Sequence, residues 1–282
     1  MKFVVTGSGG FIGSNLIRAL VSKGHEVYAA TTRDRLNGVS ADLCRGAELL
    51  KINDLLEIPD DLLADAVLFH CAWQDVPRHN DTSHYTHALK QLEFVKKVSR
   101  LRLKKVVIVG TCIEYGASTG AVSVRSEAIP TTPYGHAKTF VRHAAERLLL
   151  ETSETPFTWA RLFYVYGDSQ QERSLYAQLV KAIENKDTVF KMSRGEQLCD
   201  YMSVDEVAEC LYSIAVNCSP KVVNVCSGTP ISIRSFVERV LESKGATLKL
   251  DLGFYPYRDS DSFAMWGAES FEDQMLNNAR CD

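Results

Sequence analysis

The sequence predicts an α/β protein, with a doubly wound parallel sheet and a smaller C-terminal lobe. Short β-rich apolar runs alternate along the chain with longer helical stretches. The apolar runs show little polar alternation, which is typical of strands covered on both faces. With 282 residues, the chain is long enough to bury a full core and to carry such a lobe.

The expected strands and helices follow one another in this alternating order. Strands are expected at residues 2–7, 26–33, 48–53, 66–73, 104–111, 157–167 and 222–227, and helices between them at 14–24, 86–101 and 140–153. Strands that are separated by helices pair in parallel. We therefore expect residues 1–167 to form the sheet domain, with residues 205–228 returning to it.

The alternation loosens after Gly167. Residues 168–204 contain one expected helix, SLYAQLVKAIENK, and a short strand, TVFKM. Residues 229–282 are rich in aromatic residues, Gly and Asp, and contain one clear helix, SIRSFVERVLESKG. We expect these two segments to form a substrate-binding lobe over the carboxyl ends of the strands, where open α/β sheets bind ligands.

The composition excludes several classes of protein. A net charge of -3 argues against a nucleic-acid binder that depends on a positive field. No apolar run approaches the length of a membrane span, and the N-terminus lacks the apolar region of a secretory signal. The eight cysteines and seven histidines show no metal-site spacing. We expect a cytoplasmic protein with reduced thiols, no metal and no membrane partner.

The first expected strand runs directly into the glycine-rich stretch TGSGGFIGSNLIRAL. Gly7, Gly10 and Gly13 follow the pattern G-x-x-G-x-x-G, with Gly9 as an extra glycine. Such a turn lets the backbone approach a pyrophosphate at the positive end of the next helix. The sequence therefore predicts a Rossmann-like dinucleotide site, whose turn also includes Phe11 and Ile12.

The end of the second strand bears on the choice between NAD and NADP. A carboxylate here would bind the 2′-hydroxyl of NAD, whereas hydroxyl groups and a guanidinium suit the 2′-phosphate of NADP. The strand ends with Thr31 and Thr32, and Arg33 follows. This favours NADP(H), although a register shift of one residue would bring Asp34 into place and leave NAD possible.

Other polar residues stand at strand ends. Asn53 or Asp54, after the third strand, is placed to meet the adenine, but a turn or helix cap explains these residues equally well. Thr111 ends the fifth strand, and Tyr134 follows 23 residues later in YGHAK, four positions before Lys138. Residues at i and i+4 share one helix face, and Pro133 suits a first helical position. This spacing alone is common in helices.

Taken together, these motifs resemble the extended short-chain dehydrogenase/reductases, in the group of nucleotide-sugar epimerases, dehydratases and reductases. The resemblance covers nearly the whole chain and rests on TGSGGFIG, GTCIEYG, YGHAK, RLFYVYG and CDYMSVDEVA. It implies that Thr111, Tyr134 and Lys138 are catalytic. The cofactor contacts that we expect are completed by Asp54, Leu55, Ala72 and Leu162, together with Tyr134 and Lys138.

The expected chemistry explains these residue types. Hydride transfer to a ketone produces an alkoxide that needs a proton. A phenol with a pKa near 10 is a poor acid or base at neutral pH, so a fixed cation is needed to lower that pKa. Lys138 is expected to supply this charge and to hold the nicotinamide ribose, while Thr111 orients the keto oxygen against Tyr134.

The residues after Thr111 divide the possible reactions. The dehydratases that the chain resembles carry Asp-Glu at this point, where this chain has Cys112 and Ile113. Glu114 comes one position too late, and strand alternation would turn it to the other face, so we expect a structural role. The sequence favours an NADPH-dependent reductase of a nucleotide-linked 4-keto-6-deoxy sugar. The alternatives are a 4-epimerase with tightly bound NAD and a non-catalytic NADP-binding sensor.

The substrate side departs from the pattern of the family. Cys199 replaces an Arg, and Tyr164 replaces an Asn that contacts the sugar or the diphosphate. Arg258 matches a late diphosphate-binding Arg, although a surface ion pair is an alternative, and Arg173 and Arg194 are weaker candidates. The resemblance also implies a possible homodimer through the helices at 86–101 and 134–153.

Overall fold

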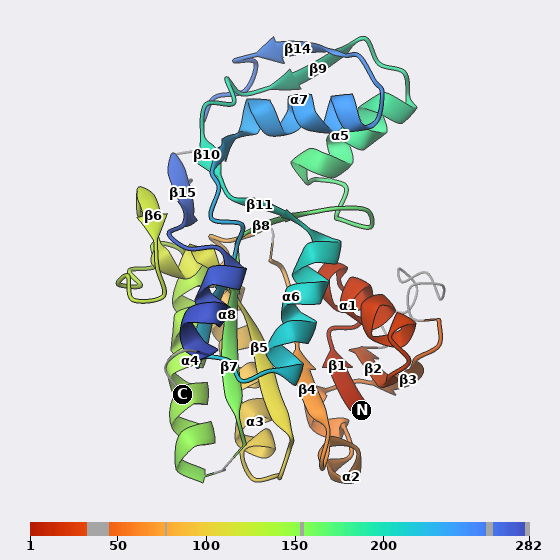
Figure 1. Ribbon diagram of the computed structural model, residues 1–282, viewed down its shortest axis with the longest axis vertical. Coiled ribbons are helices and arrows are strands. Elements are labelled where there is room, and N and C mark those ends of the chain that lie inside the picture. Colours follow the sequence, from red (N-terminus) through yellow and green to blue (C-terminus); the bar gives the residue numbers. More distant parts are fainter. Residues whose placement is uncertain (33–44, 77, 153–154, 258–261, 280–282) are drawn as a thin grey trace.

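The computed structural model describes residues 1–32, 45–76, 78–152, 155–257 and 262–279. Its main feature is a seven-stranded sheet in the order β12-β7-β5-β4-β1-β2-β3, in which all neighbouring strands are parallel (Figure 1). The strands are β1 (Lys2–Thr6), β2 (Glu26–Thr32), β3 (Glu48–Ile52), β4 (Val67–His70), β5 (Lys105–Thr111), β7 (Phe157–Leu162) and β12 (Val222–Val225). The predicted doubly wound parallel sheet is confirmed.

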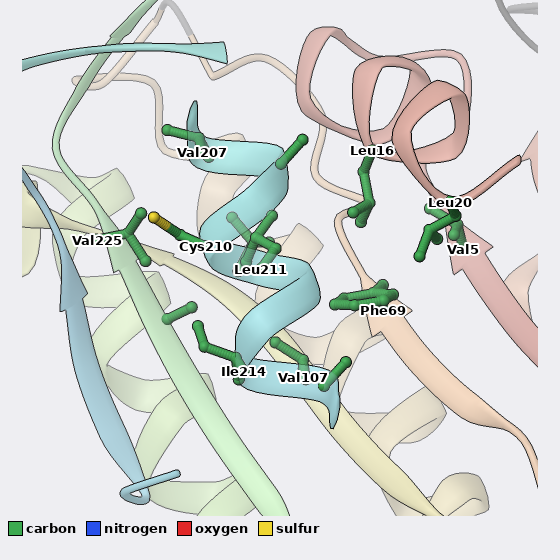
Figure 2. Packing of buried hydrophobic residues seen from close by; sticks show 14 of the residues in the cluster. Val5, Leu16, Leu20, Phe69, Val107, Val207, Cys210, Leu211, Ile214 and Val225 are labelled. Carbon is green, nitrogen blue, oxygen red and sulfur yellow. The ribbon is translucent and has the colours of Figure 1, made fainter. Parts of the chain in front are cut away.

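Helices cover both faces of this sheet. One face carries α1 (Phe11–Ser22) and α6 (Val204–Val216), and the other carries α3 (Ser83–Val98) and α4 (Pro133–Thr152). Figure 2 shows how α6 turns Val207, Leu211 and Ile214 towards the sheet. These positions are four and three residues apart, so they form one apolar stripe that is buried against the strands. Two short elements, η3 (Leu55–Glu57) and α2 (Asp60–Leu63), connect β3 to β4.

A smaller lobe lies beyond the carboxyl ends of the strands, at the top of Figure 1. It contains α5 (Leu175–Glu184), α7 (Ile233–Ser243) and the parallel pair β9 (Val189–Met192) and β14 (Lys249–Leu252). These elements bury a core of their own around Leu179, Phe190 and Val237. The lobe helices and the short strand that the sequence predicts are therefore all present.

Short strands connect the lobe to the main sheet. β8 (Tyr164–Tyr166) pairs with β11 (Tyr201–Ser203), and a four-stranded sheet combines β13 (Ile231–Ser232), β10 (Leu198–Cys199), β15 (Ala264–Gly267) and β6 (Gly120–Val122). The last elements are η4 (Cys112–Tyr115) and α8 (Phe271–Ala279). The C-terminal segment also contacts the sheet domain, because β15 pairs with β6 and Phe271 of α8 packs into the main core. These contacts cross the predicted domain boundaries at residues 167, 204 and 228. The division into domains stays a prediction.

The single strand predicted at residues 157–167 is wrong. The structure breaks it at Phe163, so that β7 belongs to the main sheet and β8 to the pair with β11. The Phe163 ring is buried in a cluster with Cys112 and Tyr115, and its N–H donates to the Val225 carbonyl at 3.2 Å. One run of apolar residues therefore serves two sheets, and the break directs the chain from the main sheet into the lobe.

Asp200, between β10 and β11, ties three segments together. Its fully buried carboxylate accepts hydrogen bonds from the Ser227 N–H and hydroxyl, both at 2.7 Å, and from the N–H groups of Gly228 at 2.9 Å and Gly267 at 3.1 Å. Hydrogen bonds to a charged group are among the stronger ones in proteins. This clasp fixes the end of β12 and the end of β15 against the β10–β11 connection.

In the described ranges, no helix combines the length and apolar character that a membrane crossing requires. The six cysteines within these ranges are reduced thiols, as the sequence predicts.

Candidate active site

The glycine turn joins β1 to α1. Gly7 has a φ of +68°, and a Cβ there would lie 2.7 Å from the backbone of Ala72, two residues beyond the end of β4. A Cβ on Gly13 would collide with the Gly7 carbonyl, and the Gly10 N–H donates to that same carbonyl at 2.9 Å. The turn is therefore packed so closely that only glycine fits at positions 7 and 13. No side chain caps the N-terminus of α1, so its N–H groups can bind a pyrophosphate.

A cavity of about 590 Å³ opens beside this turn, between the sheet and the lobe. Its size is typical of small-molecule sites. The turn contributes Gly7, Gly10, Phe11, Ile12 and Gly13, and the lobe side contributes Tyr164, Gln170, Arg173, Gln197, Cys199 and Tyr201, among others. The same cavity thus connects the predicted cofactor turn with residues that were predicted to bind substrate.

Tyr134 lies in the first turn of α4, because the helix begins at Pro133, the residue that the sequence favoured as a first helical position. The apolar pattern at 140–153 marks only the later part of this helix. Its ring is enclosed by aromatic side chains. It stacks on His79 at 5.2 Å between centroids, meets Trp73 edge-on at 5.9 Å and lies 5.0 Å from His84. The Tyr134 N–H donates to the His79 carbonyl at 3.0 Å. His79 and Trp73 line the cavity, and Tyr134 lies buried directly behind them, outside the lining itself.

Lys138 lies one helical turn beyond Tyr134 and is almost fully buried. Its Nζ donates to the Val109 carbonyl at 2.8 Å and lies 4.1 Å from the centroid of the Trp73 ring. A cation over an indole face is a favourable electrostatic contact. Burial lowers the pKa of Lys138 to about 8, against the opposing effects of Glu114 and Cys71.

The electrostatics of Tyr134 differ from the expectation. Burial, together with the charges of Glu114 and Cys112, raises the pKa of the Tyr134 phenol above its usual value, and a hydrogen bond with the Thr111 side chain lowers it only in part. The predicted lowering of this pKa by Lys138 is therefore not what the structure shows. The physical reason is that burial disfavours the phenolate, while the Lys138 Nζ is directed to the Val109 carbonyl.

Thr111 ends β5 and caps η4, which places it beside Tyr134. The Thr111 hydroxyl accepts from the Ile113 N–H at 3.3 Å. The Thr111 N–H donates to the Glu114 carboxylate at 2.9 Å. The structure therefore brings Thr111, Tyr134 and Lys138 together at one strand end, as the sequence predicted for a catalytic set, and their catalytic roles stay a prediction.

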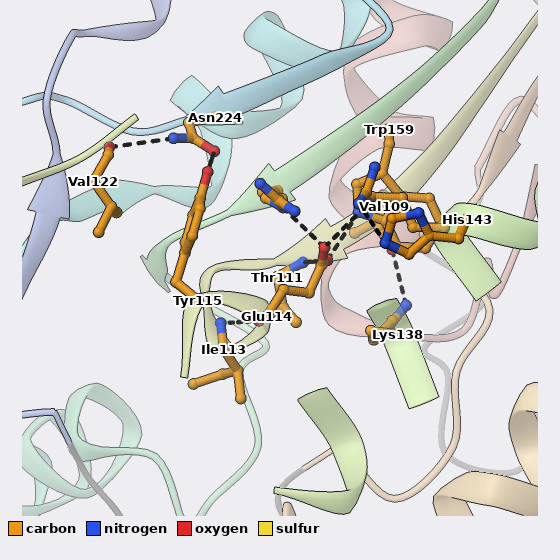
Figure 3. Close-up of polar contacts among 12 residues, drawn as sticks. Val109, Thr111, Ile113, Glu114, Tyr115, Val122, Lys138, His143, Trp159 and Asn224 are labelled. Carbon is orange, nitrogen blue, oxygen red and sulfur yellow. Dashed lines mark hydrogen bonds and ion pairs between the residues drawn. The ribbon is translucent and has the colours of Figure 1, made fainter. Parts of the chain in front are cut away.

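Glu114 was expected to lie on a strand, facing away from Ile113, and this geometry is wrong. The strand ends at Thr111, and Glu114 lies on η4 with a fully buried carboxylate. Figure 3 shows this carboxylate between the Thr111 backbone and Trp159. The expected structural role is compatible with these contacts. The lone Glu after an apolar strand, and the Arg within FTWARL, are the sequence signals that point to a buried ion pair.

The remaining cofactor candidates lie along the carboxyl edge of the sheet, outside the lining of the large cavity. Thr31 is buried near the end of β2, and Leu162 is buried at the end of β7. The Asp54 carboxylate accepts from the Leu56 N–H at 2.9 Å and caps η3, which begins at Leu55. The helix-cap explanation for Asp54 therefore holds. Arg33 lies outside the described residues.

On the substrate side, Tyr164 and Tyr201 lie 5.7 Å apart and line the cavity with Cys199. Burial and the neighbouring thiols Cys112 and Cys199 raise the pKa of the Tyr164 phenol, which keeps it neutral. Among the lining residues, Arg173 and Asp75 are the charged ones. Arg258, the predicted diphosphate ligand, lies outside the described residues. Within those residues no His, Cys, Asp and Glu side chains gather as a metal site.

The parallel sheet, the glycine turn, the cavity beside it, and the Thr111, Tyr134 and Lys138 side chains packed behind its lining residues Trp73 and His79 define a dinucleotide-dependent enzyme. The model of the NAD dependent epimerase/dehydratase family matches residues 3–226, and the chain belongs to this family. It is an NAD(P)-dependent oxidoreductase or epimerase of the nucleotide-sugar group of extended short-chain dehydrogenase/reductases.

Individual relatives support this placement. The chain is 30% identical over 275 residues to dTDP-6-deoxy-L-talose 4-dehydrogenase (NAD(+)) of Aggregatibacter actinomycetemcomitans, covering 95% of this chain and 100% of the relative. It is 23% identical over 248 residues to GDP-6-deoxy-D-talose 4-dehydrogenase of the same organism, covering 86% and 80%. The structure of a UDP-glucuronic acid 4-epimerase variant from Bacillus cereus, in complex with NAD, has a TM-score of 0.82 at 22% identity and covers 99% of this chain and 93% of its own. That likeness shows the shared fold.

Proposed function

We propose that this protein is an NADPH-dependent reductase that acts on the 4-keto group of a nucleotide-linked 6-deoxy sugar, a step in deoxysugar biosynthesis. The observation that carries the proposal is the convergence of the Thr111, Tyr134 and Lys138 side chains beside the cavity that begins at the glycine turn. A sensor that only binds the dinucleotide has no need of this set.

The residues fit a nicotinamide dinucleotide, because Gly7 and Gly13 leave a cradle that a Cβ would fill. When bound, the dinucleotide supplies the hydride. Lys138, buried under Trp73, would hold the nicotinamide ribose. The Thr111 hydroxyl would orient the keto oxygen against the Tyr134 phenol, which donates the proton that the new alcohol needs. A raised pKa keeps this phenol protonated until the alkoxide forms beside it.

The position of reduction is supported by both relatives. Each is named as a 4-dehydrogenase of a nucleotide-linked 6-deoxytalose, and the reverse of such a reaction reduces a 4-keto-6-deoxy sugar. Dehydration is disfavoured, because Cys112 is buried and Ile113 is apolar, so neither side chain provides the acid and the base that loss of water requires.

The preference for NADPH is supported by Thr31 and Thr32 at the end of β2, where an NAD-specific site would carry a carboxylate. The relative dTDP-6-deoxy-L-talose 4-dehydrogenase is named with NAD(+), which is the opposite cofactor preference. We also propose a homodimer through α3 and α4, since Tyr85, Leu89 and Phe140 on these helices are about half exposed or more. Apolar side chains of this size gathered on neighbouring helices are typical of an interface.

The test is an incubation of the protein with NADPH and a panel of nucleotide 4-keto-6-deoxyhexoses, with absorbance and product mass measured together. Reduction gives a product two mass units heavier, and NADPH is consumed in equal amount. A product of unchanged mass without loss of cofactor would make the protein a 4-epimerase. Tight cofactor binding without turnover on the whole panel would favour the sensor.

A further inference from the structure

Glu114 is the one buried carboxylate, among the described residues, that contacts the backbone of the proposed catalytic set. Its Oε1 accepts from the Thr111 N–H at 2.9 Å and from Trp159 Nε1 at 2.8 Å. Its Oε2 accepts from Arg161 Nε at 2.8 Å. Three donors from two strands therefore hold a side chain that has no exposed surface.

This arrangement fixes the turn that presents Thr111. The Glu114 carboxylate and the Thr111 hydroxyl form a reciprocal capping box at the start of η4. Gly110 precedes the turn, and a Cβ there would collide with both Trp159 and Glu114. The backbone of β5, the Glu114 carboxylate and the Trp159 indole are thus packed without spare room, so the backbone that carries Thr111 is held in place.

The carboxylate also carries a charge in a region with little solvent. The groups that face it are Arg161 from β7, Arg142 from α4 at 4.0 Å, and Tyr115 and Cys112 from its own turn. Tyr134, Lys138 and His143 from α4 also interact with its charge. Lys138 in turn faces His70 at the end of β4 and Cys71, which follows it. In a protein interior the interaction between such charges extends well beyond contact distance.

We propose that Glu114 is a positioning residue, which orients Thr111 through the backbone and whose negative charge sets the electrostatic field around Tyr134 and Lys138. The proposal rests on the proposed function in taking these three side chains as the catalytic set. Glu114 touches neither reacting group itself. The negative charge of Glu114 raises the pKa of Lys138 and the pKa of Tyr134.

The test measures NADPH affinity as a function of pH, because this readout needs no substrate. The pKa of Lys138 is about 8, so affinity falls as the pH rises through this value and Lys138 loses its proton. Glu114→Gln keeps an amide oxygen for the Thr111 N–H but removes the charge. We expect the midpoint of this loss to move to lower pH by roughly 1 unit, the size of one charge interaction in a protein interior.

Two further variants separate charge from geometry. Glu114→Asp keeps the charge but is too short to reach the Thr111 N–H, so we expect kcat to fall about tenfold or more while the pH midpoint stays. The double variant Glu114→Gln/Arg161→Gln leaves no unpaired Arg161 charge, so it folds more readily than the single variant and its midpoint moves less. Glu146→Gln is the matched control, because Glu146 pairs with the same Arg142 at 3.5 Å without contacting Thr111, and its profile should match that of the wild type.

The outcomes distinguish the two proposals. The inference would be overturned if Glu114→Gln and the double variant lose NADPH affinity at the same pH as the wild type and only melt at lower temperatures. Glu114 would then have a structural role alone. A shifted midpoint in a protein that reduces no sugar on the panel would support the role of Glu114 towards Lys138 and reject the proposed reductase. Equal shifts in Glu114→Gln and Glu146→Gln would also overturn the inference, since the effect would then belong to any nearby charge.

Discussion

Replacing Tyr134 with Phe removes one hydroxyl from the site and leaves the ring. The stack on His79 and the edge contact with Trp73 involve the ring, so they persist. The loss is the hydrogen bond with Thr111, which is worth about 1 kcal/mol of the free energy of unfolding. The proton donor disappears with it, and we expect turnover to fall about 10²-fold or more, equal to ~2.7 kcal/mol of barrier.

Tyr115→Phe is the control for this prediction. Tyr115 is equally buried, and its hydroxyl donates to Asn224 Oδ1 at 2.8 Å, away from the cavity lining (Figure 3). We expect a decrease in the free energy of unfolding of about 1–3 kcal/mol with turnover retained. The assay is steady-state turnover on a competent keto sugar, beside denaturant unfolding. Near-full turnover in Tyr134→Phe, or an equal loss in both variants, would refute the catalytic assignment.

Three other predictions test the cofactor, a buried lysine and the dimer. Wild type should bind NADPH more tightly than NADH in equilibrium titrations, and Arg33→Ala should reduce the ratio; equal affinities would assign the preference to NAD. Burial lowers the pKa of Lys105 to about 8, so the unfolded state binds more protons between pH 8 and 10.5. Over that range the free energy of unfolding of wild type should therefore rise relative to Lys105→Met, and a constant difference in denaturant titrations would contradict this. Leu89→Glu should convert a dimer into a monomer in light scattering, and an unchanged mass would place the interface elsewhere.

The glycine turn and the strands of the main sheet were predicted well, because both depend on residues that are close together in the sequence. The turn at Gly7 needs a positive φ and close backbone packing, and both requirements are visible as glycine spacing. The inner strands β1, β4, β5 and β7 are buried along almost their whole length, so their sequences are mostly apolar without polar alternation. Such signals need no knowledge of distant partners, and for this reason the fold class was predictable.

The parts that sequence could not predict depend on contacts between distant segments. Two partners of Glu114, Trp159 and Arg161, are more than 40 residues away in the sequence. The strand pattern placed the end of the fifth strand at Thr111, but it gave no indication that the chain turns into η4 there. The pKa of Tyr134 is dominated by burial beneath side chains such as His79, which no motif contains. A motif identifies the reacting groups, but their electrostatic surroundings are set by tertiary packing.

The clasp at Asp200 has a consequence for substrate choice. Its neighbours on either side, Cys199 and Tyr201, both face the cavity, while Asp200 itself is bonded to Ser227, Gly228 and the Gly267 N–H outside it. A change in those outer segments moves the peptide on which both cavity side chains are mounted. The shape of the cavity wall at Cys199 and Tyr201 can therefore be altered by substitutions at Ser227 or Gly228, which leave both lining residues in place.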